Sequence, residues 1–422
     1  MNELATALEG MAKGNVFVSV EGHKSKKIVL IGSNKRIEVE LSSERRQLAE
    51  QIGELDYYIN RPKMLVIGWD LKNLFSHVRL ILKSDYELES NLLDLKILES
   101  FLGIHEKAPI SFKNAQSRLA LVVEDESWGK LKHIYKKIHL PLLTSVMPRM
   151  ENVGVVHTKK RLKLTSCYEI LGQVNGRSKC SIVTESNFNP HSLVPSEKES
   201  IRPSGFDEMF MHFDFNHQEV SVLQWLSKDP VLGEILKTGK DLYQEIWRDI
   251  TKLEPNASSR KICKSFFLPV FFGQGAKSLS ERVGVPIDVS RKLIKKIRDR
   301  YSVAMEYVES QSVENDGFAR DYYGKKRFFG KDSYLIRNFA IQSPASTICL
   351  DKLVKLHKGL IDARLAMHIH DGYVLYSRSS DCRKIYNLAR EIMESDDDSL
   401  YPNLKLKISC EVGNNLNELK SI

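Results

Sequence analysis

Two aspartates far apart in the chain, Asp214 and Asp371, lie in segments suited to holding divalent metal ions beside a nucleoside triphosphate. Asp214 falls at the end of a predicted strand, 209–215, and Asp371 at a predicted hairpin turn between the apolar runs 367–369 and 373–376. Mg²⁺ is bound through one or two carboxylates together with substrate phosphates. Two such ions activate an attacking hydroxyl and stabilise a leaving oxygen. The pair therefore predicts phosphoryl transfer with two Mg²⁺ ions, with Mn²⁺ as a substitute.

Between these aspartates, Arg260 and Lys264 are four residues apart on a predicted helix, 258–273. Residues at this spacing share a helix face, so both cations can reach one triphosphate. Phosphoryl transfer requires mainly charge neutralisation and positioning, which such cations supply. A solvated basic helix face has the same spacing, so the pair is informative only together with the two aspartates.

The composition sets broad limits on the protein's class. At 422 residues with 42% hydrophobic content, the chain can form two or three globular domains. The net charge of +9 favours polyanionic partners. The six cysteines show no zinc-binding spacing, which indicates reduced thiols in a cytosol-like compartment. No secretory signal or transmembrane run is apparent, so we expect a cytoplasmic protein without a membrane partner. If the protein is encoded by a phage, the cytoplasm is that of a bacterial host; an organelle is the alternative.

The predicted elements change character along the chain. Strands at 16–20, 27–31, 37–41 and 64–68 with a helix at 43–54 predict an α/β domain. A helix follows over 128–150, with Pro148 marking its end, and then a loop over 178–206. Further helices are predicted at 217–227, 240–250, 258–273 and 288–311.

Short motifs around these residues resemble those of the family A DNA polymerases. Residues 214–219 (DFNHQE) resemble the family's motif A, residues 260–275 its motif B, and His370-Asp371 its motif C. Further matches are Gly176-Arg177, 324–327 (GKKR), 338–343 (NFAIQS) and 413–415 (GNN). The matches follow the family's order over roughly 150–422, so the chain is identified as a member of this family.

The resemblance implies an α+β fold shaped like a right hand. Residues 136–422 would form the polymerase domain, with an antiparallel palm sheet, helical fingers at about 240–312 and a reduced thumb. It implies that Asp214, Asp371 and the Phe215 carbonyl hold the metal ions. The residues implied to contact the incoming dNTP are Arg260, Lys264, Leu268, Phe272, Glu219 and His217, with Glu219 excluding a 2′-hydroxyl. Those implied to contact primer–template DNA are Arg177, Lys325, Lys326, Arg327, Asn338, Gln342 and His370.

Several positions depart from the family's pattern. Leu268 stands where the family has an aromatic side chain, and Phe272 stands where it has a tyrosine, whose missing hydroxyl removes a hydrogen bond to Glu219. Pro269 replaces a glycine inside the motif B helix and predicts a kink near 265–269. His217 replaces a glutamine, and Gly372 replaces the second motif C acid. We expect these changes to tune activity rather than abolish it.

Residues 1–135 resemble a degenerate 3′–5′ exonuclease domain of the α/β RNase H-like type. Ser19 and Leu74 stand where the family has acids, and Leu121 where it has a tyrosine, while Glu124-Asp125 could retain the last acid. Two-metal hydrolysis without two of its ligands should fail, so we expect no proofreading.

The thumb is expected to be missing or vestigial. Residues 150–155 (MENVGV) resemble the segment that precedes the thumb, and only about a score of residues then lead to Gly176-Arg177. Duplex would then be held by basic residues, namely Arg320, Lys325, Lys326, Arg327 and Lys331, in a salt-sensitive way. We therefore expect low processivity unless a processivity factor or other replisome protein assists, as in a phage or mobile-element replicon.

Two other functions remain open at this stage. A single-subunit RNA polymerase or primase-like enzyme shares the two aspartates and the missing second acid, although Glu219 would clash with a ribonucleotide. A non-catalytic, DNA-binding replisome scaffold would explain the departures at 268, 269, 272 and 372. The joint retention of Asp214, Asp371, Arg260 and Lys264 favours a DNA-directed DNA polymerase.

Overall fold

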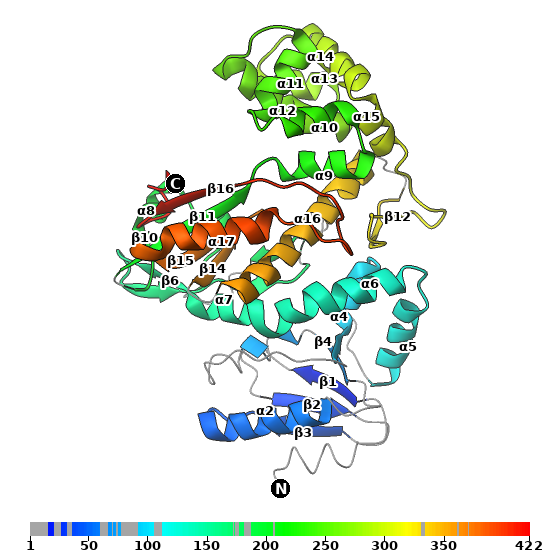
Figure 1. Ribbon diagram of the computed structural model, residues 1–422. Helices are drawn as coiled ribbons and strands as arrows, with labels where there is room; N and C mark the ends of the chain where they lie inside the picture. The colour runs from blue at the N-terminus through cyan, green and yellow to red at the C-terminus, as the bar shows by residue number, and fades with distance from the viewer. Residues whose placement is uncertain are drawn as a thin grey trace.

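The protein is described here by a computed structural model covering all residues except 1–15, 21–26, 32–35, 60–65, 70, 73–74, 77–91, 105–111, 172, 174–176, 181–186, 206, 331–333, 361–362 and 370. Three parts follow one another along the molecule (Figure 1): an N-terminal α/β part, a central antiparallel sheet crossed by the long helix α16, and a lobe of helices at the opposite end. This mixed helix and sheet arrangement confirms the predicted α+β class.

The N-terminal part is built on a mixed five-stranded sheet in the order β3-β2-β1-β4-β5. Its strands are β1 (Val16–Val20), β2 (Lys27–Ile31), β3 (Arg36–Glu40), β4 (Val66–Trp69) and β5 (Leu92–Asp94). β1 pairs antiparallel with β2 and parallel with β4. The accompanying helices are α2 (Arg45–Ile59), α4 (Leu95–Phe101) and α5 (Phe112–Val123). The four predicted strands and the helix between the third and fourth are present, while descent from an exonuclease stays a prediction.

One irregular helix joins this part to the central sheet. It comprises α6 (Trp128–Ile134), the π-helical segments η1 (Tyr135–His139) and η2 (Leu142–Val146), and α7 (Met147–Val153). The prediction that Pro148 ends this helix is wrong, because Pro148 lies at the first turn of α7, where a missing N–H is tolerated. A π-helical turn ends two residues before each of the prolines Pro141 and Pro148, and its wider hydrogen-bond spacing accommodates a residue that has no N–H donor.

The central sheet is entirely antiparallel, in the order β14-β15-β11-β16-β17. Its strands are β11 (Glu208–Phe215), β14 (Arg364–Ile369), β15 (Gly372–Arg378), β16 (Ile408–Gly413) and β17 (Lys420–Ser421). Met211 and Phe213 are buried in the main core with α16 (Tyr334–Gly359) and α17 (Cys382–Glu394). Phe210 instead joins a second core, as expected for side chains that alternate between the two faces of a strand.

That second core lies beneath a small sheet of β10 (Ile201–Arg202), β6 (Val155–His157) and β7 (Leu162–Leu164). Val155, Leu164 and Ile201 are buried there with Phe210 and Tyr376 of the central sheet. Nearby short elements are β8 (Tyr168–Glu169), β9 (Lys179–Cys180), the 3₁₀ turn η3 (Pro190–Ser192) and α8 (Pro195–Ser200). In the described part of 154–180, the chain forms short strands and no helix.

The distal lobe is helical, as predicted for about 240–312. After α9 (Gln218–Ser227) it contains α10 (Pro230–Lys237), α11 (Leu242–Thr251), α12 (Ala257–Phe271), α13 (Ala276–Val283), α14 (Ile287–Arg300) and α15 (Ser302–Glu309). Asp229, Asp241 and Asn256 cap α10, α11 and α12 by accepting backbone N–H hydrogen bonds. The hairpin β12 (Phe318–Arg320)–β13 (Lys326–Phe328) leads back to the centre.

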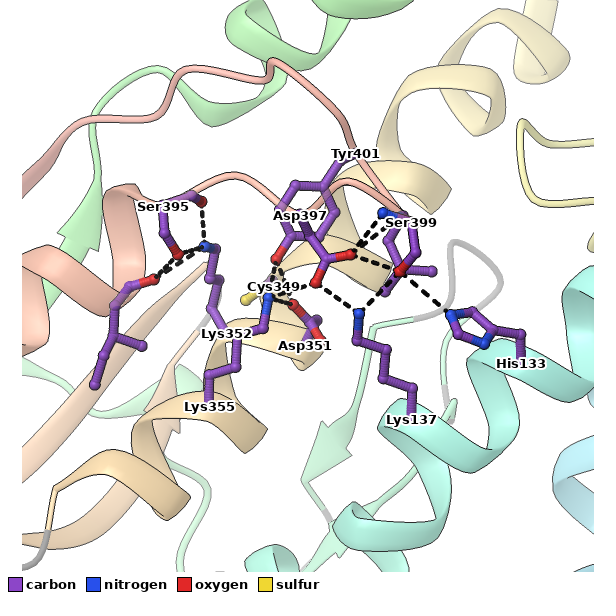
Figure 2. A network of polar contacts seen from close by, with 12 residues as sticks. His133, Lys137, Cys349, Asp351, Lys352, Lys355, Ser395, Asp397, Ser399 and Tyr401 are labelled. Carbon is purple, nitrogen blue, oxygen red and sulfur yellow. Dashed lines mark hydrogen bonds and ion pairs between the residues drawn. The ribbon is translucent and has the colours of Figure 1, made fainter.

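A charged network fixes α16 against η1 and the loop after α17 (Figure 2). The Asp397 carboxylate accepts hydrogen bonds from Lys137 Nζ at 2.6 Å and Lys355 Nζ at 2.8 Å. Although partial burial opposes the shift, these bonds hold the pKa of Asp397 far below its usual range. Tyr401 donates to Asp351, so both carboxylates are satisfied. With such charges along α16, no helix of the described chain is long and apolar enough to cross a membrane.

His139, the last residue of η1, is a buried polar group near this charged network. Its side chain is fully buried, packs on Phe101 with ring centroids 5.0 Å apart, and neither ring nitrogen finds a hydrogen-bond partner within the described chain. Burial, reinforced by Lys325, lowers the pKa of His139 well below its ordinary value. The folded protein therefore holds this imidazole neutral.

We expect the folded state to lose stability as the pH falls below about 6.5, because the unfolded chain then binds a proton that folded His139 resists. The contribution approaches about 1.4 kcal/mol per pH unit down to the folded-state pKa. His139→Leu should remove this component from the free energy of unfolding, measured by urea denaturation from pH 7 to 5. The exposed His133→Leu is the matched control, and an identical pH dependence in both variants would contradict the prediction.

Candidate active site

The strand register brings Asp214 and Asp371 to the same edge of the central sheet. Phe213 of β11 lies opposite Tyr373 of β15, so Asp214 is level with Gly372, the residue after Asp371. A Cβ atom built on Gly372 would lie 3.2 Å from Asp214 Oδ1 and 2.5 Å from the Phe213 carbonyl oxygen. The Asp214 carboxylate thus packs directly over the backbone adjoining Asp371. The absence of a side chain at position 372 permits this approach.

Arg177 connects this edge to Glu219. Its Nη2 atom lies 2.8 Å from Asp371 Oδ1 and donates to Glu219 Oε1 at 3.2 Å, while Gln342 Nε2 also donates to Glu219 Oε1 at 3.0 Å. Burial raises the pKa of the Glu219 carboxyl, with Arg177 opposing and Asp371 reinforcing the shift. One hydrogen-bonded group therefore contains four residues whose roles were predicted separately: Arg177, Glu219, Gln342 and Asp371.

Below the Asp371 turn lies a polar layer that sequence reasoning missed. The ring of His368 contacts Ser178 Oγ at 2.9 Å through Nδ1 and Cys349 Sγ at 3.5 Å through Nε2. Tyr373 OH donates to the Cys349 carbonyl at 2.6 Å, and Tyr168 OH accepts from His368 N at 3.0 Å. Ser178 follows Arg177 and His368 precedes Asp371 by three residues, so the layer joins the two segments. A histidine inside the apolar run 367–369 was its one signal in the sequence.

The residues predicted to contact the triphosphate lie on α12 and at the start of α9. Arg260 Nε donates to Asp241 Oδ2 at 2.7 Å, whereas Lys264, one turn later on α12, is exposed. His217 caps α9 in a left-handed conformation and packs against Tyr243, with ring centroids 4.9 Å apart. Burial lowers the pKa of His217; Asp241 opposes the shift, and both Arg260 and Lys264 add to it. Arg260 and Lys264 are thus both electrostatically coupled to His217, within the segment that resembles motif A.

Leu268 and Phe272 lie at the C-terminal end of α12, where both are half-buried and pack against the main core. Pro269 lies within α12, two residues before its last residue, and the helix is unbroken through it. Its missing N–H falls in the last turn, where one lost hydrogen bond does not end the helix. The kink near 265–269 stays a prediction.

The residues predicted to contact DNA fall into two groups. Asn338 and Gln342 are one turn apart on α16, and Asn338 Oδ1 is buried without a hydrogen-bond partner in the described chain. His370 lies outside the described residues. Lys325 and Arg327 are buried; their side chains donate to Thr347 Oγ1 at 2.6 Å and the Ser100 carbonyl at 2.7 Å. Burial lowers the pKa of Lys325 to about 8.

The basic surface predicted to hold duplex is instead largely an internal joint. Arg320 pairs with Asp125 at 2.9 Å and Glu314 at 2.8 Å, and Lys326 approaches the same two carboxylates at 3.7 and 3.6 Å. Although burial opposes the shift, hydrogen bonds from Arg320 and Ser127 hold the pKa of Asp125 below its usual value. Lys325 and Arg327, predicted to contact DNA, have buried side chains, so their contact with DNA stays a prediction, and Lys331 lies outside the described residues. Asp125, one of the two acids that could survive from an exonuclease, pairs with Arg320 in this joint.

The donors at the sheet edge fit a divalent ion that also binds a substrate. No group of three or more His, Cys, Asp or Glu side chains suited to a metal occurs in the described chain. Asp214 and Asp371, with the Phe215 carbonyl after Asp214, offer hard oxygen donors that would need phosphate oxygens and water to complete coordination, as Mg²⁺ sites commonly do. The contact of Arg177 with Asp371 shows that this carboxylate already attracts a cation.

The antiparallel sheet bears two carboxylates at one edge, and the helical lobe bears Arg260 and Lys264, so the two parts offer oxygen donors for a cation and cations for an anion. The profile of DNA polymerase family A matches residues 190–418, more than half of the chain. The chain belongs to DNA polymerase family A.

Among its relatives, DNA polymerase I of Helicobacter pylori is 24% identical over 411 residues, covering 92% of this chain and 41% of the relative. DNA polymerase I of Chloroflexus aurantiacus is 23% identical, covering 62% and 29%. DNA polymerase theta of Drosophila melanogaster is 22% identical, covering 79% and 17%. The chain therefore spans less than half the length of each of these relatives.

Among solved structures, the polymerase domain of Pol1 from M. smegmatis, in complex with DNA primer-template and dNTP, superposes with a TM-score of 0.77. The match covers 99% of this chain and 98% of that one at 12% sequence identity. At this identity the likeness establishes the fold, and it agrees with the right-hand arrangement implied by the motifs.

Gly372→Ala should destabilise the protein by about 1–3 kcal/mol, since the new methyl group would press on the Phe213 carbonyl and the Asp214 carboxylate. Gly129→Ala, on α6 with nothing within 4 Å of the added carbon, is the matched control and should be neutral or stabilising. Chemical denaturation of the three proteins measures both effects. Equal stability of Gly372→Ala and the wild type would contradict the prediction, because it would show that the backbone at this sheet edge can shift without cost.

Proposed function

We propose that the protein is a DNA-directed DNA polymerase that extends a primer with dNTPs by two-metal nucleotidyl transfer. The observation that carries the proposal is the packing of Asp214 against Gly372, beside Asp371, with Arg177, Glu219 and Gln342 bonded around them. Family membership supports the same chemistry. A scaffold protein has no need of this carboxylate pair or of the surrounding ion pairs.

Asp214, Asp371 and the Phe215 carbonyl would hold two divalent ions, Mg²⁺ or Mn²⁺, which supply Lewis-acid activation of the primer hydroxyl and charge stabilisation of the leaving pyrophosphate. The chain's own contribution is to fix both carboxylates on paired strands, so little reorganisation is required on binding. On DNA binding, Arg177 would leave Asp371 and contact the primer–template end. Asn338, Gln342 and His370 would contact the same end.

The incoming triphosphate would be bound by Arg260 and Lys264. Arg260 now bonds to Asp241 across a partly exposed ion pair, with 39% and 29% of the two side chains exposed. A surface pair of this kind contributes little stability, so a triphosphate can compete for the guanidinium at small cost. His217, held neutral between these groups, would line the same site with Leu268 and Phe272.

Sugar selection would depend on Glu219. Its carboxylate is fixed by Arg177 and Gln342, which replace the tyrosine hydroxyl absent at Phe272. Fixed in this way, it would meet a 2′-hydroxyl at close range. This arrangement favours a DNA polymerase over an RNA polymerase or primase-like enzyme.

We further propose that the enzyme lacks proofreading and has low intrinsic processivity. Asp125 bonds to Arg320 rather than facing an open site, and short strands replace a helical thumb after α7 in the described chain. A processivity factor or other replisome protein would then assist, as in a phage-type replicon. A reducing compartment such as the cytoplasm suits the six free thiols.

Asp371→Ala and Asp214→Ala should each lower the primer-extension rate by at least about 100-fold, because one fixed carboxylate is lost from the metal site. Extension of a labelled primer with Mg²⁺ and dNTPs measures the rate. Asp398→Ala, which removes an exposed carboxylate after α17, is the control and should retain full activity. Equal activity in Asp371→Ala and the wild type, including none in either, would support a scaffold instead.

Glu219→Ala should lower the preference for dNTP over NTP by about 10-fold or more, because the site then accommodates a 2′-hydroxyl. Single-nucleotide incorporation of dATP and ATP on one primed template gives the ratio of kcat/KM values. Glu391→Ala, on the exposed side of α17, should leave this ratio unchanged. A wild-type enzyme that prefers ATP would point to the RNA polymerase alternative.

A further inference from the structure

The turn between β6 and β7 carries an exposed concentration of positive charge. Lys159, Lys160, Arg161 and Lys163 occupy four of five consecutive positions, and all four side chains are exposed. No ion pair joins any of them to a carboxylate in the described part of the chain, and Lys163 Nζ donates to the Asn152 carbonyl at 2.9 Å. We call these four residues the basic turn.

Two other groups of cations in the protein are partly neutralised by acids. On α14, Arg291 pairs with Asp288, Lys295 with Asp299 and Arg298 with Glu309. Arg320 and Lys326 share Asp125 and Glu314. The basic turn differs because its charge is not offset, so it retains the stronger attraction for a polyanion.

The basic turn is also held firmly to the central sheet. Val155, the first residue of β6, and Leu164, the last of β7, are buried in the second core, and Tyr376 OH donates to the Gly154 carbonyl. Between them, Thr158 N donates to the Ser200 carbonyl at 2.9 Å and Lys160 N to His157 Nδ1 at 3.2 Å. Because this backbone is already ordered, ligand binding would cost little additional conformational entropy.

The chain after the basic turn leads directly to the candidate active site. Seven Cα–Cα steps lead from Arg161 to Tyr168, which limits the distance between these two residues to about 25 Å even in a fully extended chain. Tyr168 OH bonds to the backbone of His368, three residues before Asp371. Phosphates on one strand of B-DNA are about 3.4 Å apart along the axis, so a duplex of about 12 base pairs extends about 41 Å.

We propose that the basic turn binds the phosphate backbone of the primer–template duplex. The inference rests on the proposed function and adds the surface that holds the product duplex. The contact is independent of sequence, because it addresses phosphates rather than base edges. It supplies the duplex contact that the buried Lys325 and Arg327 do not provide.

The test compares two double variants with the same loss of charge. Lys159→Ala/Lys160→Ala removes two cations from the basic turn, and Arg45→Ala/Arg46→Ala removes two exposed cations from α2, at the N-terminal end of the molecule (Figure 1). Fluorescence anisotropy measures binding of a 12-base-pair primer–template from 50 to 300 mM KCl, without dNTP or divalent ions. Each phosphate contact contributes about 0.9 to the slope of log K against log salt concentration.

We expect the slope of the basic-turn variant to be smaller in magnitude by about 1.8, and that of the α2 variant to match the wild type. Lys159→Arg/Lys160→Arg should restore the wild-type slope, because both charges return. An unchanged slope in the basic-turn variant, or an equal change in both double variants, would overturn the inference. Thermal melting establishes that each variant is folded before its binding is measured.

The outcome is separable from that of the proposed function, because binding is measured without catalysis. If the slope depends on Lys159 and Lys160 but the wild type extends no primer, the polymerase proposal fails and the DNA contact stands. If the wild type extends primers and the slope does not change in Lys159→Ala/Lys160→Ala, this inference alone fails.

Discussion

The pairing of β11 with β15 is the constraint on which the candidate site depends. Antiparallel register sets Phe213 opposite Tyr373 and leaves Asp214 level with Gly372. Since side chains alternate between the faces of a strand, a one-residue slip would turn Asp214 and the core residues Met211 and Phe213 to the opposite faces. Burial of those two side chains therefore also fixes the direction of the carboxylate. Packing energy and site geometry are set by the same register.

Three carboxylates close to one another would repel, and the surrounding cations offset that repulsion. Arg177 bonds to both Asp371 and Glu219, and burial still keeps the pKa of Glu219 raised. The same guanidinium is implied at the primer end by the family's motif. An exchange of Arg177 between acids and DNA would couple substrate binding to the release of Asp371 for a metal ion.

Internal ion pairs take up some of the protein's cations. Arg320 and Lys326 join the hairpin β12–β13 to Asp125, and Lys137 and Lys355 join η1 and α16 to Asp397. The net charge of +9 therefore does not by itself define a DNA-binding surface. The basic turn between β6 and β7 is exposed and makes no such ion pair within the described residues, so its charge is available to a partner.

The sequence by itself determined the class of fold, most of the helices and strands, and the identity of the two aspartates. Local periodicity specifies elements such as α9, β11 and the hairpin at Asp371, and motif order specifies the family. It did not determine which cations face solvent: Lys325 and Arg327 resemble DNA-binding residues in a motif, yet both are buried. Nor did it reveal the His368 layer or the helix continuing through Pro148. Burial and hydrogen-bond partners arise between segments far apart in the chain, so only the tertiary structure could decide them.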